Sequence, residues 1–221
     1  MNVKSREETK RDIVDQMFWD PVVDASRVEV EMTDSKIVLK GMVPSYYAKE
    51  SAWKDAWLVS NGYDIVNNLT IEYPEAIRLL SDEQLEEFVK SALFFSPAFD
   101  STKLDVSVKD RTVRITGTVD SYWQKDRLNA VVSEIKGIHD IDNRVEVVVP
   151  EKVPDEKIVA DIFYAFLRSV GLDTNHVRVR GVEGKVTLEG RVPDKVTYDA
   201  VVKIVVFTRG VTGFDNKLEI R

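Results

Sequence analysis

The sequence is short of the residue types on which many enzymes and metal proteins depend. It contains no cysteine and only two histidines in 221 residues. The missing cysteine excludes disulfides, thiolate metal sites and cysteine nucleophiles. His139 and His176 do not have the spacing of a metal-binding pair, and no serine lies in a nucleophile-elbow context. We therefore expect a protein that is not an enzyme and that carries no cofactor.

Two further absences concern partners and location. No apolar run approaches the roughly 20 residues of a membrane span. Basic residues do not outnumber acidic ones: 31 against 38 give a net charge of −7, which argues against a nucleic-acid-binding protein. The first ten residues lack the apolar core of a secretory signal. The expectation is a cytoplasmic protein as written, or a periplasmic one if a signal has been removed.

The chain does contain one sequence pattern that occurs three times. A glycine follows a strand-like run in "IVLKG", "VRITG" and "VTLEG", at intervals of 117 − 41 = 76 and 190 − 117 = 73 residues. A second glycine follows each of these, and an asparagine lies six residues beyond it. Repeats of this length indicate one supersecondary unit used several times. The repeat signature consists of Gly41, Gly62, Asn68, Gly117, Gly137, Asn143, Gly190, Gly210 and Asn216.

Each copy predicts the same order of elements, α-β-β-α-β. In the second copy Leu85, Val89 and Leu93 recur at helical spacing, and alternating apolar residues on either side of "KDR" predict a hairpin. Ser5 with Glu8 and Ser81 with Gln84 have the capping-box spacing, and Ser45, Ser121 and Asp194 lie where the second helices need an N-cap. The predicted fold class is α+β: three tandem two-layer sandwich domains at 1–75, 76–150 and 151–221, each a three-stranded sheet with two helices on one face.

The same residues carry a family resemblance. "LKGMV…GYDIVNNL", "ITGTV…GIHDIDNRV" and "LEGRV…GVTGFDNKL" resemble the BON domain, named for bacterial osmotic-stress and nodulation proteins. The resemblance covers essentially the whole chain and implies an α/β sandwich in each copy. It also implies a stress-associated protein that binds phospholipid surfaces or envelope components, in a family mostly without enzymatic activity.

Aromatic residues at the start of the second helices form the first candidate surface. Two readings stay open: one ring of each pair packs on the sheet, or one faces outward as an anchor for lipid headgroups or a partner. Lysines follow on the same helical face. The candidate residues are Tyr46, Tyr47, Lys49, Tyr122, Trp123 and Lys125. The consecutive aromatics of "MFWDP" and "LFFSP" cannot all face one core, so we expect some of them to pack between copies.

The second candidate surface is a strand in the third copy. His176, Arg178 and Arg180 alternate in "HVRVRG", which places them on one face. The three copies have net charges of −5, −3 and +1 (9 − 14, 10 − 13 and 12 − 11). A basic strand in the least acidic copy fits an anionic partner. A solvated strand face is the simpler alternative.

Two hypotheses follow. The chain docks on anionic phospholipid or a similar envelope surface without inserting a membrane span, or it is a protein-interaction or chaperone-like module that uses exposed aromatic faces and self-associates. Salt dependence separates them, because electrostatic docking on lipid weakens as salt rises.

Overall fold

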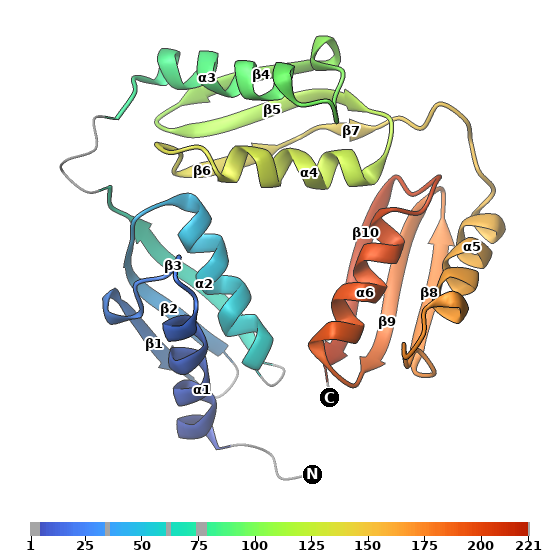
Figure 1. The fold of residues 1–221 in the computed structure, drawn as a ribbon, viewed down its shortest axis with the longest axis horizontal. Helices are drawn as coiled ribbons and strands as arrows, with labels where there is room; N and C mark the ends of the chain where they lie inside the picture. The colour runs from blue at the N-terminus through green and yellow to red at the C-terminus, as the bar shows by residue number, and fades with distance from the viewer. Residues whose placement is uncertain (1–4, 34–35, 61–62, 74–78, 221) are drawn as a thin grey trace. The chain divides into compact units, whose positions relative to one another are not determined.

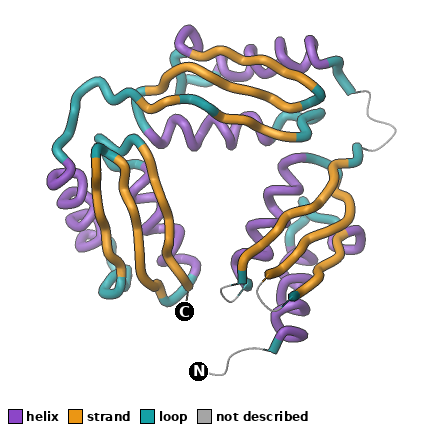
Figure 2. Tube along the Cα trace, turned by 180° about the vertical axis from the view of Figure 1, so that it is seen from behind, coloured by secondary structure: helices purple, strands orange, loops and turns teal. Residues whose placement is uncertain are grey.

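The computed structural model describes residues 5–33, 36–60, 63–73 and 79–220. These residues form six α-helices and three sheets, and the order α-β-β-α-β occurs three times, so the predicted fold class is confirmed. They fall into two compact units: residues 1–85, 109–112 and 133–140 form one, and 86–108, 113–132 and 141–221 form the other. In each repeat the two helices cover one face of the sheet, and the strands lie in front of them when seen from behind (Figures 1 and 2).

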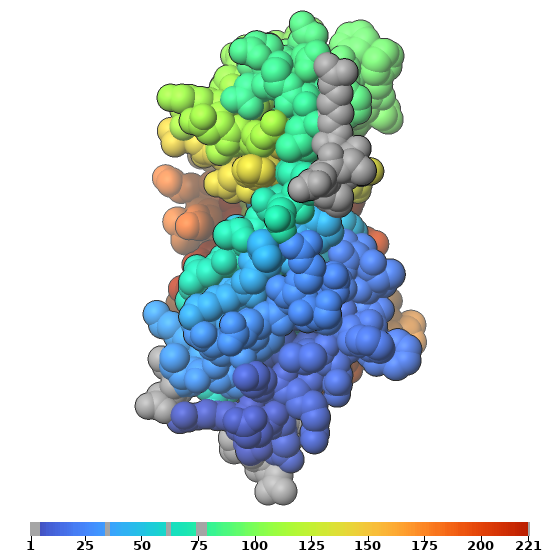
Figure 3. Space-filling model, turned by 90° about the vertical axis from the view of Figure 1, so that its left-hand side faces the viewer, coloured from blue at the N-terminus to red at the C-terminus, as the bar shows by residue number. Residues whose placement is uncertain are grey.

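The first repeat lies entirely in the first unit. It consists of α1 (Arg6–Trp19), β1 (Val28–Met32), β2 (Lys36–Val43), α2 (Tyr46–Val59) and β3 (Asp64–Ile71). The central strand β2 pairs antiparallel with β1 and parallel with β3. Its core draws one apolar stripe from each helix and alternate residues from each strand. In Figure 3 the described residues of this repeat, coloured from blue to teal, form one continuous body.

The second repeat contributes to both units. It consists of α3 (Asp82–Phe95), β4 (Leu104–Lys109), β5 (Thr112–Val119), α4 (Tyr122–Ser133), β6 (Asp140–Asn143) and β7 (Glu146–Val147). Both β6 and β7 pair with the central strand β5, so the last strand of this repeat is interrupted.

The third repeat, in the second unit, consists of α5 (Asp155–Arg168), β8 (Val177–Val182), β9 (Lys185–Val192), α6 (Lys195–Val206) and β10 (Gly213–Ile220). Here β9 pairs antiparallel with β8 and parallel with β10.

Helix starts agree with the predicted caps. Glu8 and Ser5 form a reciprocal capping box, and Gln84 with Ser81 does the same. Ser45 and Asp194 accept hydrogen bonds from the N–H groups of Ala48 and Thr197. At Ser121 the arrangement differs, because the Gln124 side chain accepts from both the Asp120 N–H and the Ser121 hydroxyl. These bonds fix where the helices begin, except at α5, whose N-cap residue Pro154 makes no side-chain cap hydrogen bond.

The first glycine of each repeat lies where the central strand passes close to the beginning of its antiparallel neighbour. Gly41, Gly117 and Gly190 have φ values of 112°, 112° and 120°. A Cβ atom at these positions would lie 2.1, 2.0 and 1.9 Å from the carbonyl oxygens of Arg27, Lys103 and His176. No side chain fits there, so the repeated glycine is a requirement of the backbone. Of the second glycines, Gly137 and Gly210 also have positive φ, and Gly62 lies outside the described residues.

The asparagine of the last strand binds backbone groups. Asn143 and Asn216 each accept the N–H of the residue two positions on. In the first repeat Asn67 does this, with the Leu69 N–H, and its amide donates to the Lys49 carbonyl. Asn68, which the glycine spacing indicated, is instead an exposed residue on β3. The reason is the longer spacing from Gly41 to Gly62, which displaces the alignment by one residue, and the strand register places Asn67 opposite Leu39.

Candidate functional site

The aromatic pairs of the second helices are largely occupied by contacts. Trp123 stacks on Phe207 with ring centroids 5.9 Å apart, and Tyr122 meets Phe214 edge-on at 6.2 Å, both within the second unit. Tyr46 is half-buried and Tyr47 is 41% exposed. Tyr46, Tyr122 and Trp123 are therefore partly buried, and among these four residues Tyr47 is the ring that faces outward.

Burial determines the state of the tyrosine hydroxyls. It raises the pKa of Tyr46, with a smaller contribution from Glu50. It also raises the pKa of Tyr122, to which Asp126 adds. Both hydroxyls therefore stay neutral across the physiological range, and neither supplies an ionised nucleophile. Lys49 and Lys125 are half-buried beside them.

The open face of the third repeat is the most strongly charged sheet surface among the described residues. The alternation places Arg178 and Arg180 of β8 on the face away from the helices, because Val177, Val186 and Leu188 point into the core. The register of β9 and β10 adds further cations to this face. We call this surface the basic sheet face. Its charged residues are Arg178, Arg180, Lys185, Glu189, Arg191, Asp215, Lys217 and Glu219.

Ion pairs neutralise part of this face. Glu189 lies 3.8 Å from Arg180, Glu219 lies 3.5 Å from Arg191, and Asp215 lies 3.5 Å from Lys217. Arg178 and Lys185 have no ion pair within the part of the chain that the structure describes. One guanidinium group, of Arg178, and one ammonium group, of Lys185, thus remain for an anion from outside. Exposed His176 precedes them at the same edge, and it lines a shallow hollow with Arg178 and Arg191.

The corresponding faces of the other repeats lack this surplus. At the positions of Arg178 and Arg180 the first repeat has Glu29 and Glu31, since Val28 pairs with Gly41 as Val177 pairs with Gly190. Glu31 also binds Lys40 at 2.5 Å. In the second repeat Arg114 and Arg144 both pair with Asp142, at 2.9 Å each. Three sheets of one topology therefore carry three different charge patterns.

A second recurring feature is the end of the first helix. Phe18 and Trp19 are 75% and 80% exposed, and Phe94 and Phe95 are 67% and 80% exposed. Each pair makes an edge-on contact within itself. Only the preceding residue of each run, Met17 or Leu93, reaches the core, so the rings point away from the core of their own repeat. That some of these rings pack between copies stays a prediction. The third repeat has exposed Leu167 at this position.

Potential metal-binding side chains are dispersed over the described residues. Within the ranges described, no three His, Cys, Asp or Glu side chains lie close enough to hold a metal ion. His139 stacks on Tyr73 at 5.8 Å, and burial lowers its pKa, as do Arg111 and Lys49. None of the helices described is long and apolar enough to cross a bilayer.

Sequence comparison accounts for the threefold pattern. The family model described as BON domain matches residues 5–73, 81–149 and 154–221. The chain belongs to the BON family. A BON-family relative is osmotically-inducible protein Y of Escherichia coli (strain K12), which is 22% identical over 193 residues, or 85% of this chain and 96% of the relative.

Solved structures of low similarity cover most of the chain. The C-terminal domain of CdsD, a structural protein of the type III secretion system of Chlamydia trachomatis, is 14% identical with a TM-score of 0.27 and covers 99% of this chain and 100% of its own. The periplasmic domain of the inner membrane protein PrgH from S. typhimurium is 11% identical with a TM-score of 0.21, over 89% of this chain and 95% of its own. The BON assignment does not depend on either of them.

The sequence identified part of the basic sheet face. His176, Arg178 and Arg180 follow from the alternation of a single strand, whereas Lys185, Arg191 and Lys217 join them through pairing between strands. The alternation of "KVTLEGRV" was a signal for the β9 residues. Lys217 could be placed only once the parallel register was known.

Proposed function

We propose that this BON-family chain is a non-enzymatic, stress-associated protein that docks on anionic phospholipid surfaces. The observation that carries the proposal is the basic sheet face, where Arg178 and Arg180 replace the glutamates that the first repeat has at the same positions. The association with stress rests on the similarity to a relative named as osmotically inducible.

The chemistry of the basic sheet face suits phosphate groups in a plane. Its strands display cations at alternate positions, so Arg178, Arg180 and Lys185 project from the same side of one sheet. Each basic residue near an anionic membrane surface contributes about 1 kcal/mol to binding. Guanidinium groups also donate two parallel hydrogen bonds to one phosphate, which ammonium groups do not.

An apolar residue lies on the same face. Val182, at the end of β8, is 68% exposed, and it lines a hollow with Arg180 and Lys185. An exposed valine between cations fits the boundary between headgroups and acyl chains, where apolar burial adds to electrostatic attraction. We infer peripheral docking, in which the sheet lies on the surface and no part of it spans the bilayer.

Vesicle co-sedimentation of the full chain tests the proposal. Neutral phosphatidylcholine vesicles are compared with vesicles that also contain phosphatidylglycerol, at low salt and at about 0.15 M salt. We expect binding to the anionic vesicles alone, weaker at the higher salt. The double variant Arg178→Glu/Arg180→Glu loses at least about 2 kcal/mol of interaction, or roughly thirtyfold in affinity.

The matched control is Lys54→Glu/Lys136→Glu, which changes the net charge equally at two exposed positions outside the basic sheet face. It is expected to bind as the original chain does, apart from a small effect of net charge. If both double variants lose binding to the same degree, the total charge determines docking and the basic sheet face does not. Binding to neutral vesicles that is as tight as binding to anionic vesicles would also contradict the proposal.

A further inference from the structure

Helix α3 of the second repeat is apolar on two sides. Leu85, Val89 and Leu93 are at most 1% exposed and fill the core. On the outer side Phe88 is 54% exposed, and the Phe94–Phe95 pair follows within two turns. A helix that needs one apolar stripe to fold does not need the second. Large exposed apolar surface of this kind marks an interaction site.

Phe88 distinguishes this helix from its two counterparts. The first helices align through Ser5, Ser81 and Pro154, which precede or cap them. At the position of Phe88 the first repeat has Asp12 and the third has Asp161. An aromatic residue at this helix position therefore belongs to the second repeat, whereas the third repeat exposes aromatic side chains at other positions of α5, with Phe163 41% and Tyr164 59% exposed.

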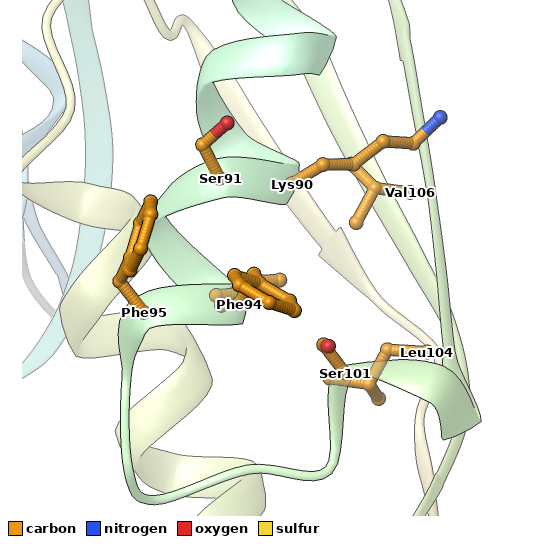
Figure 4. Close-up of a pocket in the computed structure, with 8 residues that line it drawn as sticks. Lys90, Ser91, Phe94, Phe95, Ser101, Leu104 and Val106 are labelled. Atoms are coloured by element: carbon orange, nitrogen blue, oxygen red, sulfur yellow. The ribbon is translucent and has the colours of Figure 1, made fainter.

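A hollow of about 470 Å³ opens beside these rings (Figure 4). The aliphatic lining comes from Leu93 of α3 and from Leu104 and Val106 of β4. Phe94 and Phe95 lie at the side of the hollow. Strand β4 is at the edge of its sheet. The hollow thus lies between a helix and an edge strand, where bulky apolar side chains of a bound polypeptide can be buried.

The charge of α3 decides which kind of partner fits. The helix carries four acidic residues and one basic residue, Lys90. Glu86 pairs with Lys90 at 2.5 Å and also accepts the Val108 N–H, so the single cation is neutralised. Glu83 and Glu87, one turn apart, are exposed and have no ion pair in the portion of the chain that the structure covers.

We propose that α3 and its hollow bind a cationic, apolar segment of another polypeptide. Glu83 and Glu87 attract Lys or Arg side chains, and an adjacent aliphatic or aromatic side chain enters the hollow beside Phe94 and Phe95. The same carboxylates repel an anionic bilayer. This site is therefore separate from the basic sheet face, and its partner has the opposite charge. We call it the α3 site.

Fluorescence anisotropy with labelled synthetic peptides and the full chain tests the α3 site. The probe is a short peptide of alternating Lys and Leu, and the comparison peptides replace Leu by Ser or Lys by Glu. We expect the Lys–Leu peptide to bind, and both comparison peptides to bind at least about tenfold more weakly. Phe94→Ser/Phe95→Ser and Glu83→Lys/Glu87→Lys should each weaken the Lys–Leu peptide by a similar factor.

Two controls match these variants. Phe18→Ser/Trp19→Ser removes the exposed pair at the equivalent positions of the first repeat. Glu29→Lys/Glu31→Lys changes the net charge as much as the α3 reversal does. Both controls are expected to leave binding of the Lys–Leu peptide within about twofold.

Several results would overturn the inference. If Phe18→Ser/Trp19→Ser weakens the peptide as much as Phe94→Ser/Phe95→Ser, any exposed aromatic pair suffices. If the Lys–Ser peptide binds equally well, the interaction is charge attraction alone. Loss of vesicle binding in Phe94→Ser/Phe95→Ser would make lipid the occupant. Dimers that dissociate in this variant, as measured by sedimentation, would make it a second copy. None of these results affects the vesicle experiment with Arg178→Glu/Arg180→Glu, which tests the proposed function separately.

Discussion

The carboxylate of Asp82, in the first turn of α3, accepts hydrogen bonds from the backbone N–H groups of Arg111 at 3.2 Å and Asp110 at 2.7 Å. Both hairpin residues have positive φ, 60° and 49°. The third repeat has the same arrangement: Asp155 of α5 accepts from Glu183 and Gly184, at 2.8 Å each. One acidic side chain thus fastens the hairpin turn to the start of the first helix and satisfies two N–H groups.

Loss of this contact is expected to destabilise the third repeat. Asp155→Ala leaves two turn N–H groups without their charged acceptor and lowers the free energy of unfolding by about 2 to 3 kcal/mol. Glu156→Ala, at an exposed neighbouring position, changes it by less than about 0.5 kcal/mol. Urea unfolding of both variants measures the difference. Equal losses would mean that the charge near the helix N-terminus matters and the hairpin contact does not.

The pH dependence of the first repeat should follow Asp55. This residue of α2 is 9% exposed. Burial raises the pKa of its carboxyl from 3.8 to about 6. The negative charge of Asp20 also raises this pKa, whereas the hydrogen bond from Gln16 lowers it. Because the pKa is raised in the folded state, the favourable contribution is complete below about pH 4 and is lost as the pH rises through 6. At neutral pH the buried carboxylate costs on the order of 2 to 3 kcal/mol.

Asp55→Asn removes that cost. We expect a higher thermal midpoint than the original chain at about pH 7.5 and little difference at about pH 4. Asp15→Asn, on an exposed position of α1, is the control and should not change with pH in this way. A stabilisation of Asp55→Asn that is the same at both pH values would contradict the explanation.

The glycine of the central strand can be separated from the general cost of a positive φ. Gly190→Ala places Cβ 1.9 Å from the His176 carbonyl oxygen, so the strands must move apart, at a cost of about 3 kcal/mol or more. Gly171 also has positive φ, 79°, but nothing lies within 4 Å of an added Cβ. Gly171→Ala therefore costs about 1 to 2 kcal/mol. Hydrogen exchange of the β9 amides measures both, and equal effects would count against the close approach.

The charge pattern of the third repeat should be transferable. Glu29→Arg/Glu31→Arg places the two arginines of β8 at the same positions of β1, on a sheet of the same topology. We expect this variant to bind phosphatidylglycerol vesicles more tightly than the original chain, by roughly tenfold or more. It should also restore binding to the Arg178→Glu/Arg180→Glu variant. Failure of both would show that features beyond sheet charge are needed.

Local signals in the sequence were sufficient for the order of elements. The stripe of Leu85, Val89 and Leu93 and the capping residues Ser5 and Ser81 act within one or two turns, so they could be read without a structure. The repetition of the pattern three times supplied the fold. The displacement from Asn68 to Asn67 could not be read, because one extra residue in the first repeat is absorbed before β3 and only strand register reveals where.

The candidate surfaces depended on contacts between distant residues. Trp123 is covered by Phe207, which lies in a different repeat and shares no local pattern with it. Lys217 joins Arg178 only through two strand pairings. The sequence indicated that Phe94 and Phe95 cannot both face one core, but not that Leu93 alone of this run is buried. Sequence patterns report one element at a time, and these surfaces are built from several.

The division of labour within each strand has a wider consequence. The residues that fix the fold face the helices, and those that set the surface charge face the other way, so the two sets can change independently. After duplication, one copy could exchange Glu29 and Glu31 for arginines without losing a single core contact. A tandem array of this kind is a means of evolving new specificities at low risk, because each copy can be altered while its neighbours preserve the original role.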